Sequence, residues 1–522
     1  MKKKFNVTGT CYPTLHYMMD NSAKIKAVMD MVEAGEYFII NRPRQYGKTT
    51  TLFCLYDLLE KTEGYLPVRM NFQGVDEKWH ESDGAFAKMF VGQLQKALKF
   101  VKPELTNFLQ VLTEYVKDMD SLSETITELV HKAEKNIVLL IDEVDASSNY
   151  EPFLRFLGML RTKYLDRFSP QHFTFHSIVL AGVHDIKNLK SKIRPADGAQ
   201  YNSPWNIATD FKVEMAFNPL EIVPMLTAYS EAEGVQMDVT AMSEKLYHYT
   251  SGYPFLVSKL CKIIAEDILP HKTEKTWTLE DLERAVNLLL KENNTNFDSL
   301  IKNLENNPDL YNLAFEIIVN GVEVPFDPHE PITSLGRLYG LFKQNGRLKI
   351  HNWIYEQILF NYMTAKAFNE YLKNRKENLP SSFTKQNNEL DLEAVLLKFQ
   401  QYLKEQYSAK DQPFLEREWR LIFLAFLKPI INGKGHDFKE AQISDEKRLD
   451  IAITYFHHKY VIELKRWYGE KAHQAGLDQL SDYLTRQNLT SGYLIIFEHQ
   501  REKTWRQERI RHGDKEVFAV WV

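Results

Sequence analysis

The sequence is poor in the features that mark secreted, zinc-stapled or membrane-embedded proteins. Its 522 residues include only three cysteines, too few and too widely spaced for a disulfide framework or a cysteine zinc site. No apolar run approaches the length of a membrane span, and the basic start of the chain lacks the apolar segment of a signal peptide. We therefore expect a soluble protein of the reducing cytoplasm, with no membrane partner.

An excess of charge of one sign is also lacking. The chain has 65 Lys and Arg against 70 Asp and Glu, a net charge of −5, so any basic surface that attracts nucleic acid must be local. The hydrophobic content of 44% and the charged content of 26% are those of an ordinary globular protein. The length is sufficient for roughly two to four domains.

The strongest motif is YFIINRPRQYGKTT, residues 37–50. An apolar strand runs into a loop that ends in Gly-Lys-Thr, and apolar residues at helical spacing follow. This is the order of a P-loop, whose backbone N–H groups and helix N-terminus bind phosphates. Lys48 would reach the β- and γ-phosphates, and the Thr49 hydroxyl would ligate Mg²⁺. The predicted ATP-binding residues are Arg42, Pro43, Arg44, Gln45, Tyr46, Gly47, Lys48, Thr49 and Thr50.

The loop departs from the GxxxxGK[ST] pattern at its first position, where Arg42 replaces glycine. We expect Arg42 and Pro43 to make the entrance turn, because the proline ring fixes φ. The alternative is a strand–helix turn with a chance Gly-Lys-Thr. The strand before the loop and the helix after it favour the P-loop.

A second apolar strand, residues 137–141, ends in Asp142-Glu143. Five consecutive apolar residues are typical of a strand buried on both faces of a parallel sheet. Carboxylates at the C-terminal end of such a strand lie beside the P-loop. We expect Asp142 to hold Mg²⁺ and Glu143 to polarise the attacking water.

Three other residues are weaker candidates for the nucleotide site. Tyr17 lies upstream of the P-loop and could contact the adenine, although a core or capping role is favoured. His184 follows a strand predicted at residues 173–183 and could sense the γ-phosphate. Arg194 lies in a basic loop that could contact phosphate, with a solvated loop as an equal alternative. A final strand of the sheet is predicted at residues 211–217.

The chain after this sheet divides into three parts. Residues 220–375 are mainly helical, and a helix, a turn at Asn345-Gly346, a short strand and another helix suggest a winged-helix module, which binds DNA in some proteins and only packs in others. Residues 376–391 are polar and unpatterned, as in a linker. We therefore predict an ATPase domain (1–219), a helical lid and winged-helix-like region (220–375), a linker (376–391) and a C-terminal α/β domain (392–522).

The C-terminal domain carries its own pair of carboxylates. Asp450 begins one predicted strand, and Glu463 and Lys465 end the next on a common face. A turn at His457-His458 would bring Asp450 level with Glu463. Two such carboxylates bind a metal ion, and a lysine beside them can orient or deprotonate water, as in phosphodiester hydrolysis. This spacing also occurs by chance on strand surfaces, but the order of the surrounding elements favours a site.

Two further residues could support this second site. Glu418 on the preceding helix shares the face of Leu415 and Ile422, and Gln479 lies on the following helix.

These motifs carry two resemblances. RPRQYGKTT, LLIDEVD and SGYPFLV resemble the AAA-like (STAND-related, archaeal-type) P-loop ATPases, in which Arg-Pro-Arg replaces the usual first glycine. RLDIAI, YVIELKRW and GLDQLSDYL resemble the PD-(D/E)XK nuclease superfamily. By position, the ATPase residues would be Lys48, Thr49, Asp142 and Glu143, and the nuclease residues Asp450, Glu463, Lys465 and Gln479. The implied fold class is α/β, a parallel-sheet ATPase followed by a nuclease-like domain.

The expected function is that of an ATPase whose nucleotide state controls a metal-dependent nuclease. ATP and Mg²⁺ are the expected cofactors, and the expected partner is a nucleic acid, with DNA favoured. The alternative is a regulatory ATP switch whose nuclease-like domain is a non-catalytic interaction module. A motor is disfavoured because no helicase motif accompanies the two nucleotide-site strands, and a homo-oligomer remains open.

Overall fold

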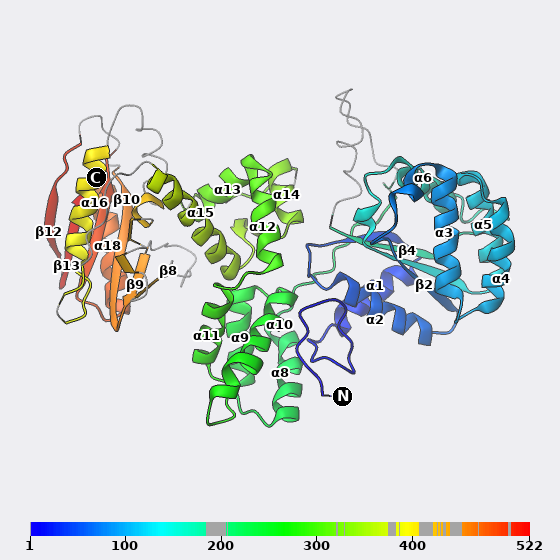
Figure 1. Ribbon diagram of the computed structural model, residues 1–522, viewed down its shortest axis with the longest axis horizontal. Coiled ribbons are helices and arrows are strands. Elements are labelled where there is room, and N and C mark those ends of the chain that lie inside the picture. The colour runs from blue at the N-terminus through cyan, green and yellow to red at the C-terminus, as the bar shows by residue number, and fades with distance from the viewer. Residues whose placement is uncertain are drawn as a thin grey trace. The chain divides into compact units, whose positions relative to one another are not determined.

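The computed structural model forms two compact units, whose elements are labelled in Figure 1. The described residues are 2–183, 205, 207–319, 322–327, 329–373, 383–385, 387–406, 421–424, 426–427, 430–431, 435–438, 451–467, 469–498 and 503–522. The first unit comprises Met1–Leu310 and Pro325–Ile354, and the second Tyr311–Val324 and Tyr355–Val522. The four-part division expected from the sequence stays a prediction.

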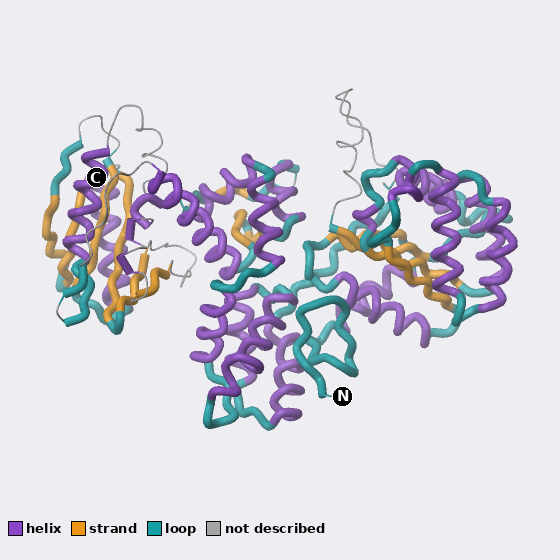
Figure 2. The backbone as a smooth tube through the Cα atoms, in the orientation of Figure 1, coloured by secondary structure: helices purple, strands orange, loops and turns teal. Residues whose placement is uncertain are grey.

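The first unit is built on a four-stranded sheet in which all neighbouring strands are parallel (Figure 2). In sheet order the strands are β1 (Tyr37–Asn41), β4 (Ser177–Gly182), β3 (Asn136–Asp142) and β2 (Tyr65–Asn71). Nearly every residue of β1, β3 and β4 is buried, as expected for apolar strands covered on both faces. The predicted parallel α/β sheet is confirmed.

Helices cover both faces of this sheet (Figure 1). On one face, alternate strand residues such as Ile137, Leu139 and Ile141 join a core with α3 (Asp83–Leu98), α4 (Pro103–Leu112), α5 (Met119–Ala133) and α6 (Glu151–Leu165). The other face is covered by α1 (Ser22–Glu33) and α2 (Lys48–Lys61). Because α2 begins where the loop after β1 ends, the loop lies at the carboxyl edge of the sheet.

The prediction of a last strand of this sheet at residues 211–217 is wrong. Thr209 donates its N–H to the carbonyl of Tyr37 in a single bridge, and no strand follows. The carbonyls of Phe211 and Val213 instead accept hydrogen bonds from the side chain of Arg42. The alternation of apolar and polar residues in this segment therefore belongs to an extended chain whose carbonyls are bound by the Arg42 side chain and not by a neighbouring strand. The strand predicted from residue 173 begins at Ser177.

A group of helices follows the sheet. α8 (Pro219–Glu233) begins with a capping box between Asn218 and Glu221 and ends at Gly234 in the left-handed conformation. The other helices are α9 (Val239–Thr250), α10 (Pro254–Ile263), α11 (Leu279–Leu289), α12 (Thr295–Glu305), α13 (Pro308–Ile318), α14 (Pro331–Leu338) and α15 (Trp353–Lys373). The short strands are β5 (Val324–Pro325), β6 (Phe342–Asn345) and β7 (Arg347–Ile350). β6 and β7 form an antiparallel hairpin that turns at Gly346.

The second unit contains a mixed six-stranded sheet. In sheet order its strands are β12 (Gln507–His512), β13 (Lys515–Trp521), β11 (Ser491–Phe497), β10 (His458–Arg466), β9 (Ile451–Tyr455) and β8 (Gly435–Phe438). β11 is parallel to both β10 and β13, and the other pairs are antiparallel. Helix α18 (Glu470–Arg486) packs on one face of the sheet, and α16 (Leu392–Gln406) contacts β13.

None of the helices in the described part of the chain is both long enough and apolar enough to cross a membrane.

Candidate functional site

The loop between β1 and α2 has the backbone conformation of an anion-binding site. Gln45 and Gly47 have positive φ values of 58° and 83°, so right- and left-handed residues alternate along the loop. Within the described part of the chain, the N–H groups of Arg44, Gln45, Tyr46 and Gly47 donate to no carbonyl or side chain. Successive N–H groups in such a turn, at the start of a helix, form a concave site for phosphate.

The side chain of Lys48 is hydrogen-bonded to the first residues of the same loop. Its side chain is buried, and Nζ donates hydrogen bonds to the carbonyls of Arg42 and Pro43, both at 2.9 Å. An ammonium group has three donors, so the third remains available to a phosphate oxygen. Burial lowers the pKa of Lys48, while Glu143, Asp145 and Asp142 act in the opposite direction. The lysine is thus positioned between the loop and a group of carboxylates.

The two residues that end β3 occupy different environments. The Asp142 side chain is 1% exposed, and its Oδ1 accepts the N–H of Glu143 at 3.1 Å. Its Oδ2 accepts no hydrogen bond from the described residues and lies 4.0 Å from Nη2 of Arg69. Glu143 has a left-handed backbone, with φ of 55°, and burial raises the pKa of its half-buried carboxyl group. Backbone strain of this kind is concentrated at functional sites.

These residues fit a bound Mg²⁺ ion. The described residues contain no cluster of three acidic, histidine or cysteine side chains that would bind a metal alone. Mg²⁺ in nucleotide sites takes few protein ligands and completes its shell with water and phosphate oxygens. The buried, unbonded Oδ2 of Asp142 and the partly buried Thr49 hydroxyl are suitable oxygen donors.

Two other residues at this edge escaped sequence reasoning. Arg69 lies on β2, and only the strand order places it beside Asp142. Asp145 accepts the N–H of Val183 and packs against Gly182, which ties the end of β3 to the end of β4. The sequence signal for Asp145 was present, since it is the last acidic residue of the Asp-Glu-Val-Asp run.

The remaining loop residues contact later parts of the first unit. The Tyr46 ring packs edge-on against Tyr253, and its hydroxyl lies 3.0 Å from Nε2 of His351. The Tyr253 hydroxyl donates to the carbonyl of Arg44. Pro43 is buried beside Gly340, where an added Cβ would lie 2.7 Å from the proline ring. The hydroxyl of Thr50 accepts the N–H of Cys11 at 3.1 Å.

Of the weaker candidates for the nucleotide site, only Tyr17 lies within the described residues. Tyr17 is buried among aromatic rings that include Phe5 and Tyr229, and its hydroxyl donates to Glu233 at 3.3 Å. These are the contacts of the core role that was favoured for it. His184 and Arg194 lie outside the described residues.

In the second unit, three of the predicted residues meet on one face of the sheet. Glu463 is completely buried, and Nζ of Lys465 lies 2.7 Å from its Oε1. The same amine donates to Oε1 of Gln479 on α18 at 3.2 Å. Gly476 of α18 lies beside this lysine, and an added Cβ there would be in ordinary van der Waals contact with the lysine side-chain carbons, at 3.5 Å.

The partner strand of this site is only partly described. Ile451 pairs with Ile462, the neighbour of Glu463. Asp450 and Glu418 lie outside the described residues. The hairpin turn falls at Phe456 and His457, one residue earlier than predicted.

Comparison with known proteins identifies the family. A sequence model of the AAA-like domain matches residues 12–359, more than half of the chain. The chain therefore belongs to the AAA-like domain family, and the predicted resemblance of its first part is confirmed. The nuclease resemblance of residues 392–522, which lie beyond this match, stays a prediction.

Individual proteins are similar at low identity. An uncharacterized WD repeat-containing protein of Synechocystis, slr0143, is 23% identical over 370 residues, which are 66% of this chain and 29% of that protein. The chain thus spans less than a third of this relative. The Walker-type ATPase PABY2304 of Pyrococcus abyssi is similar in structure, with 12% identity and a TM-score of 0.47 over 68% of this chain and 99% of the other. The Aeropyrum pernix ORC2 protein has 11% identity and a TM-score of 0.37 over 66% and 94%.

Proposed function

We propose that the chain binds and hydrolyses ATP at residues 42–50 and that its nucleotide state controls a metal-dependent nuclease in residues 392–522. The observation that carries the ATP site is the run of four unbonded N–H groups that lies next to Lys48. Membership of the AAA-like domain family supports the same assignment.

The side chains divide the work of ATP hydrolysis. The loop N–H groups and the third donor of Lys48 bind the β- and γ-phosphate oxygens. Thr49 and Asp142 would hold Mg²⁺, and a bound Mg²⁺ would supply positive charge beside the phosphates. Glu143 accepts a proton from the attacking water, a role for which a raised carboxyl pKa is suited.

Nucleotide binding is tested with the Lys48→Ala variant. Calorimetric titration with ATP and Mg²⁺ should show binding to the wild-type chain and none to the variant, because the charge facing the phosphates is removed. Lys61→Ala is the matched control, since Lys61 lies on the same helix and pairs only with the exposed Asp57. Equal affinity of a folded Lys48→Ala protein would contradict the site.

The nuclease proposal is supported by the contacts of Glu463, Lys465 and Gln479. Glu463, with Asp450, would hold a divalent cation, and Lys465 would orient or deprotonate the attacking water. A buried carboxylate is tolerated only with a cation or a proton beside it, and here the lysine amine is the cation. The proposed substrate is nucleic acid, with DNA favoured.

Cleavage by the full chain separates this proposal from a non-catalytic interaction module. DNA should be cut in the presence of Mg²⁺ or Mn²⁺, and Lys465→Ala should abolish cutting while ATP binding is retained. Lys459→Ala, an exposed position on the same strand, should cut like the wild type. Metal-independent binding of DNA without cleavage would favour the interaction module.

A further inference from the structure

The side chain of Arg42 is directed away from the phosphate-binding N–H groups. Its guanidinium group donates to the carbonyl of Val213 at 2.8 Å, to that of Phe211 at 3.4 Å and to that of Asn41 at 3.0 Å. It also lies over the ring of Phe211, with 5.1 Å between Cζ and the ring centroid. Apart from the bond to Asn41, these contacts bind the extended segment after the sheet, residues 209–218, which we call the connector.

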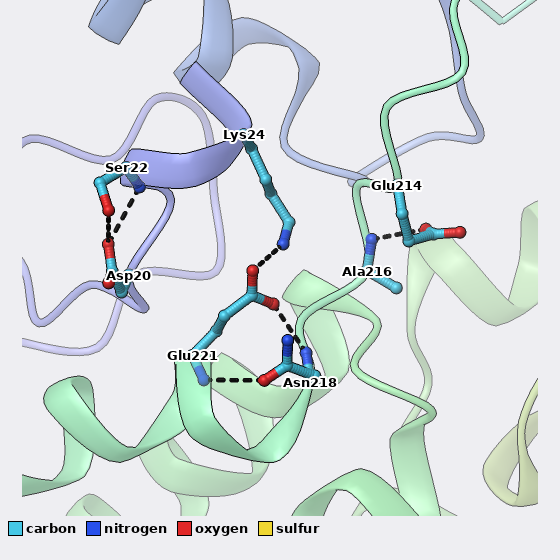
Figure 3. A network of polar contacts seen from close by, with 7 residues as sticks. All are labelled: Asp20, Ser22, Lys24, Glu214, Ala216, Asn218 and Glu221. Carbon is cyan, nitrogen blue, oxygen red and sulfur yellow. Dashed lines mark hydrogen bonds and ion pairs between the residues drawn. The ribbon is translucent and has the colours of Figure 1, made fainter. Parts of the chain in front are cut away.

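The connector joins the sheet to α8. At its far end, the N–H of Phe217 donates to the carbonyl of Gly252 at 2.9 Å. Lys24 of α1 lies 4.7 Å from the centroid of the Phe217 ring and pairs with Glu221 in the first turn of α8 (Figure 3). Asn218 and Glu221 complete the capping box that begins α8. The connector is therefore fixed to α8 at one end and to Arg42 at the other.

The second arginine of the loop has a different environment. Arg44 is exposed, and while its carbonyl accepts the Tyr253 hydroxyl, its side chain makes no hydrogen bond or ion pair with the described residues. Its charge lowers the pKa of Lys48 and of Glu143, so it is close enough to act on both groups. The two arginines flank Pro43, and only Arg42 is engaged by the connector.

We propose that the side chain of Arg42 is a positioning group that fixes the connector, and with it α8, to the entrance of the P-loop, and that this side chain binds no phosphate. A planar guanidinium with several donors can bridge neighbouring carbonyls in a way that a lysine ammonium cannot. The carbonyl of Arg42 accepts the amine of Lys48, so one residue contacts both the catalytic lysine and the connector. This inference rests on the proposed ATP site, in which Lys48 and the exposed Arg44 are the cations left available to phosphate.

The test compares Arg42→Ala, Arg42→Lys and Arg44→Ala in the full chain. Calorimetry with ADP gives affinity, steady-state turnover of ATP gives kcat and KM, and amide hydrogen exchange of peptides within residues 209–218 reports on the connector. Arg42→Ala should keep the ADP affinity within about threefold and exchange about tenfold faster in the connector, with a lower kcat at nearly unchanged KM. Arg44→Ala should weaken nucleotide binding and leave connector exchange unchanged.

Arg42→Lys and Phe211→Leu are milder changes that keep the proposal testable if Arg42→Ala fails to fold. The lysine can keep one carbonyl bond, so connector exchange should fall between the wild type and Arg42→Ala. Phe211→Leu keeps an apolar side chain but removes the ring beneath the guanidinium, and it should also speed connector exchange. Wild-type exchange in Arg42→Lys and Phe211→Leu would overturn the proposal, as would a loss of ADP affinity in Arg42→Ala as large as that in Arg44→Ala.

A failure of the proposed ATP site can be distinguished from a failure of the inference about Arg42. A wild-type chain that binds no nucleotide would refute the ATP site, while the exchange measurements would still decide whether Arg42 holds the connector.

Discussion

At the scale of single residues, Glu143 is the position where strain, burial and charge coincide. Its carboxyl group is held by a left-handed backbone beside Asp142 and within the field of Lys48. A group that acts on water contributes to the hydrolysis rate more than to binding. Glu143→Gln should therefore retain ATP affinity and hydrolyse ATP more slowly, by about 10²-fold or more, as measured by phosphate release. Wild-type turnover would mean that another residue activates the water.

The same residue predicts a pH dependence. Burial raises the pKa of Glu143, and Lys48 only partly opposes this effect. Because the proton acceptor must be ionised, kcat should fall as the pH is lowered, beginning above the range of an ordinary glutamate. Glu143→Gln should lack this acidic limb, since its amide does not titrate. An acidic limb of the same midpoint in both proteins would assign it to a different group.

Short motifs in the sequence indicated the central residues of the proposed ATP site. Gly-Lys-Thr and Asp-Glu are local signals, and the elements around them are strongly apolar. The partners of Arg42 were not predictable, because Phe211 and Val213 are 169 and 171 residues away in the sequence. Arg69 was missed for the same reason, since its position beside Asp142 depends on which strand neighbours β3.

At the scale of elements, Gly252 connects the lid helices to the connector. An added Cβ there would lie 1.9 Å from the carbonyl oxygen of Phe217, and its φ is +70°. Gly234 has a similar φ of +64°, but no atom lies within 4 Å of an added Cβ. A substitution at Gly234 therefore measures the cost of placing an L-residue in the left-handed conformation, without a steric clash. Gly234→Ala should cost about 1 kcal/mol and Gly252→Ala more than about 3 kcal/mol in urea unfolding. Equal costs would contradict a close approach at Gly252.

The buried His351, which contacts Tyr46 of the loop, predicts that the stability of the fold depends on pH. Burial, with a smaller contribution from Lys343, lowers the pKa of this histidine to about 3 from its ordinary value of 6.5. Between these values the unfolded chain binds the proton and the folded chain does not, so this contribution to stability is present above pH 6.5 and is lost as the pH falls toward 3.

The loss is measurable against a variant that does not titrate. From pH 7 to pH 5 the wild type should lose about 2 kcal/mol more of its free energy of unfolding than His351→Gln, which can still bond the Tyr46 hydroxyl. Parallel losses in the two proteins would show that His351 titrates normally in the fold.

The prediction of strands from the sequence succeeded for the buried strands of the sheet. It failed for the segment whose carbonyls are bound by a side chain and not by a neighbouring strand. The apolar runs of β1, β3 and β4 could belong only to a covered sheet. Residues 211–217 have the alternation of an edge strand, yet the guanidinium of Arg42 takes two of their carbonyls. The local periodicity of a sequence indicates that a segment is extended. It does not indicate which groups complete the hydrogen bonds of that segment.

At the scale of the whole molecule, the two proposed sites lie in two different compact units. The first unit holds the loop and carboxylates of the proposed ATP site, and the second holds Glu463, Lys465 and Gln479. The sequence predicted both groups of residues from their spacing. It could not predict the helical contacts of the loop, because Tyr253 and His351 reach Tyr46 from more than 200 positions along the chain.

Control of one site by the other is the central claim, and DNA cleavage by the full chain tests it most directly. Cleavage rates with Mg²⁺ should be measured without nucleotide, with ATP and with ADP, for the wild type, Lys48→Ala and Lys465→Ala. A coupling free energy of ordinary size predicts that ATP changes the wild-type rate by about tenfold or more. Lys48→Ala should cut DNA at one rate whatever the nucleotide, and Lys465→Ala should not cut. A wild-type rate that is the same with ATP, with ADP and without nucleotide would contradict the account.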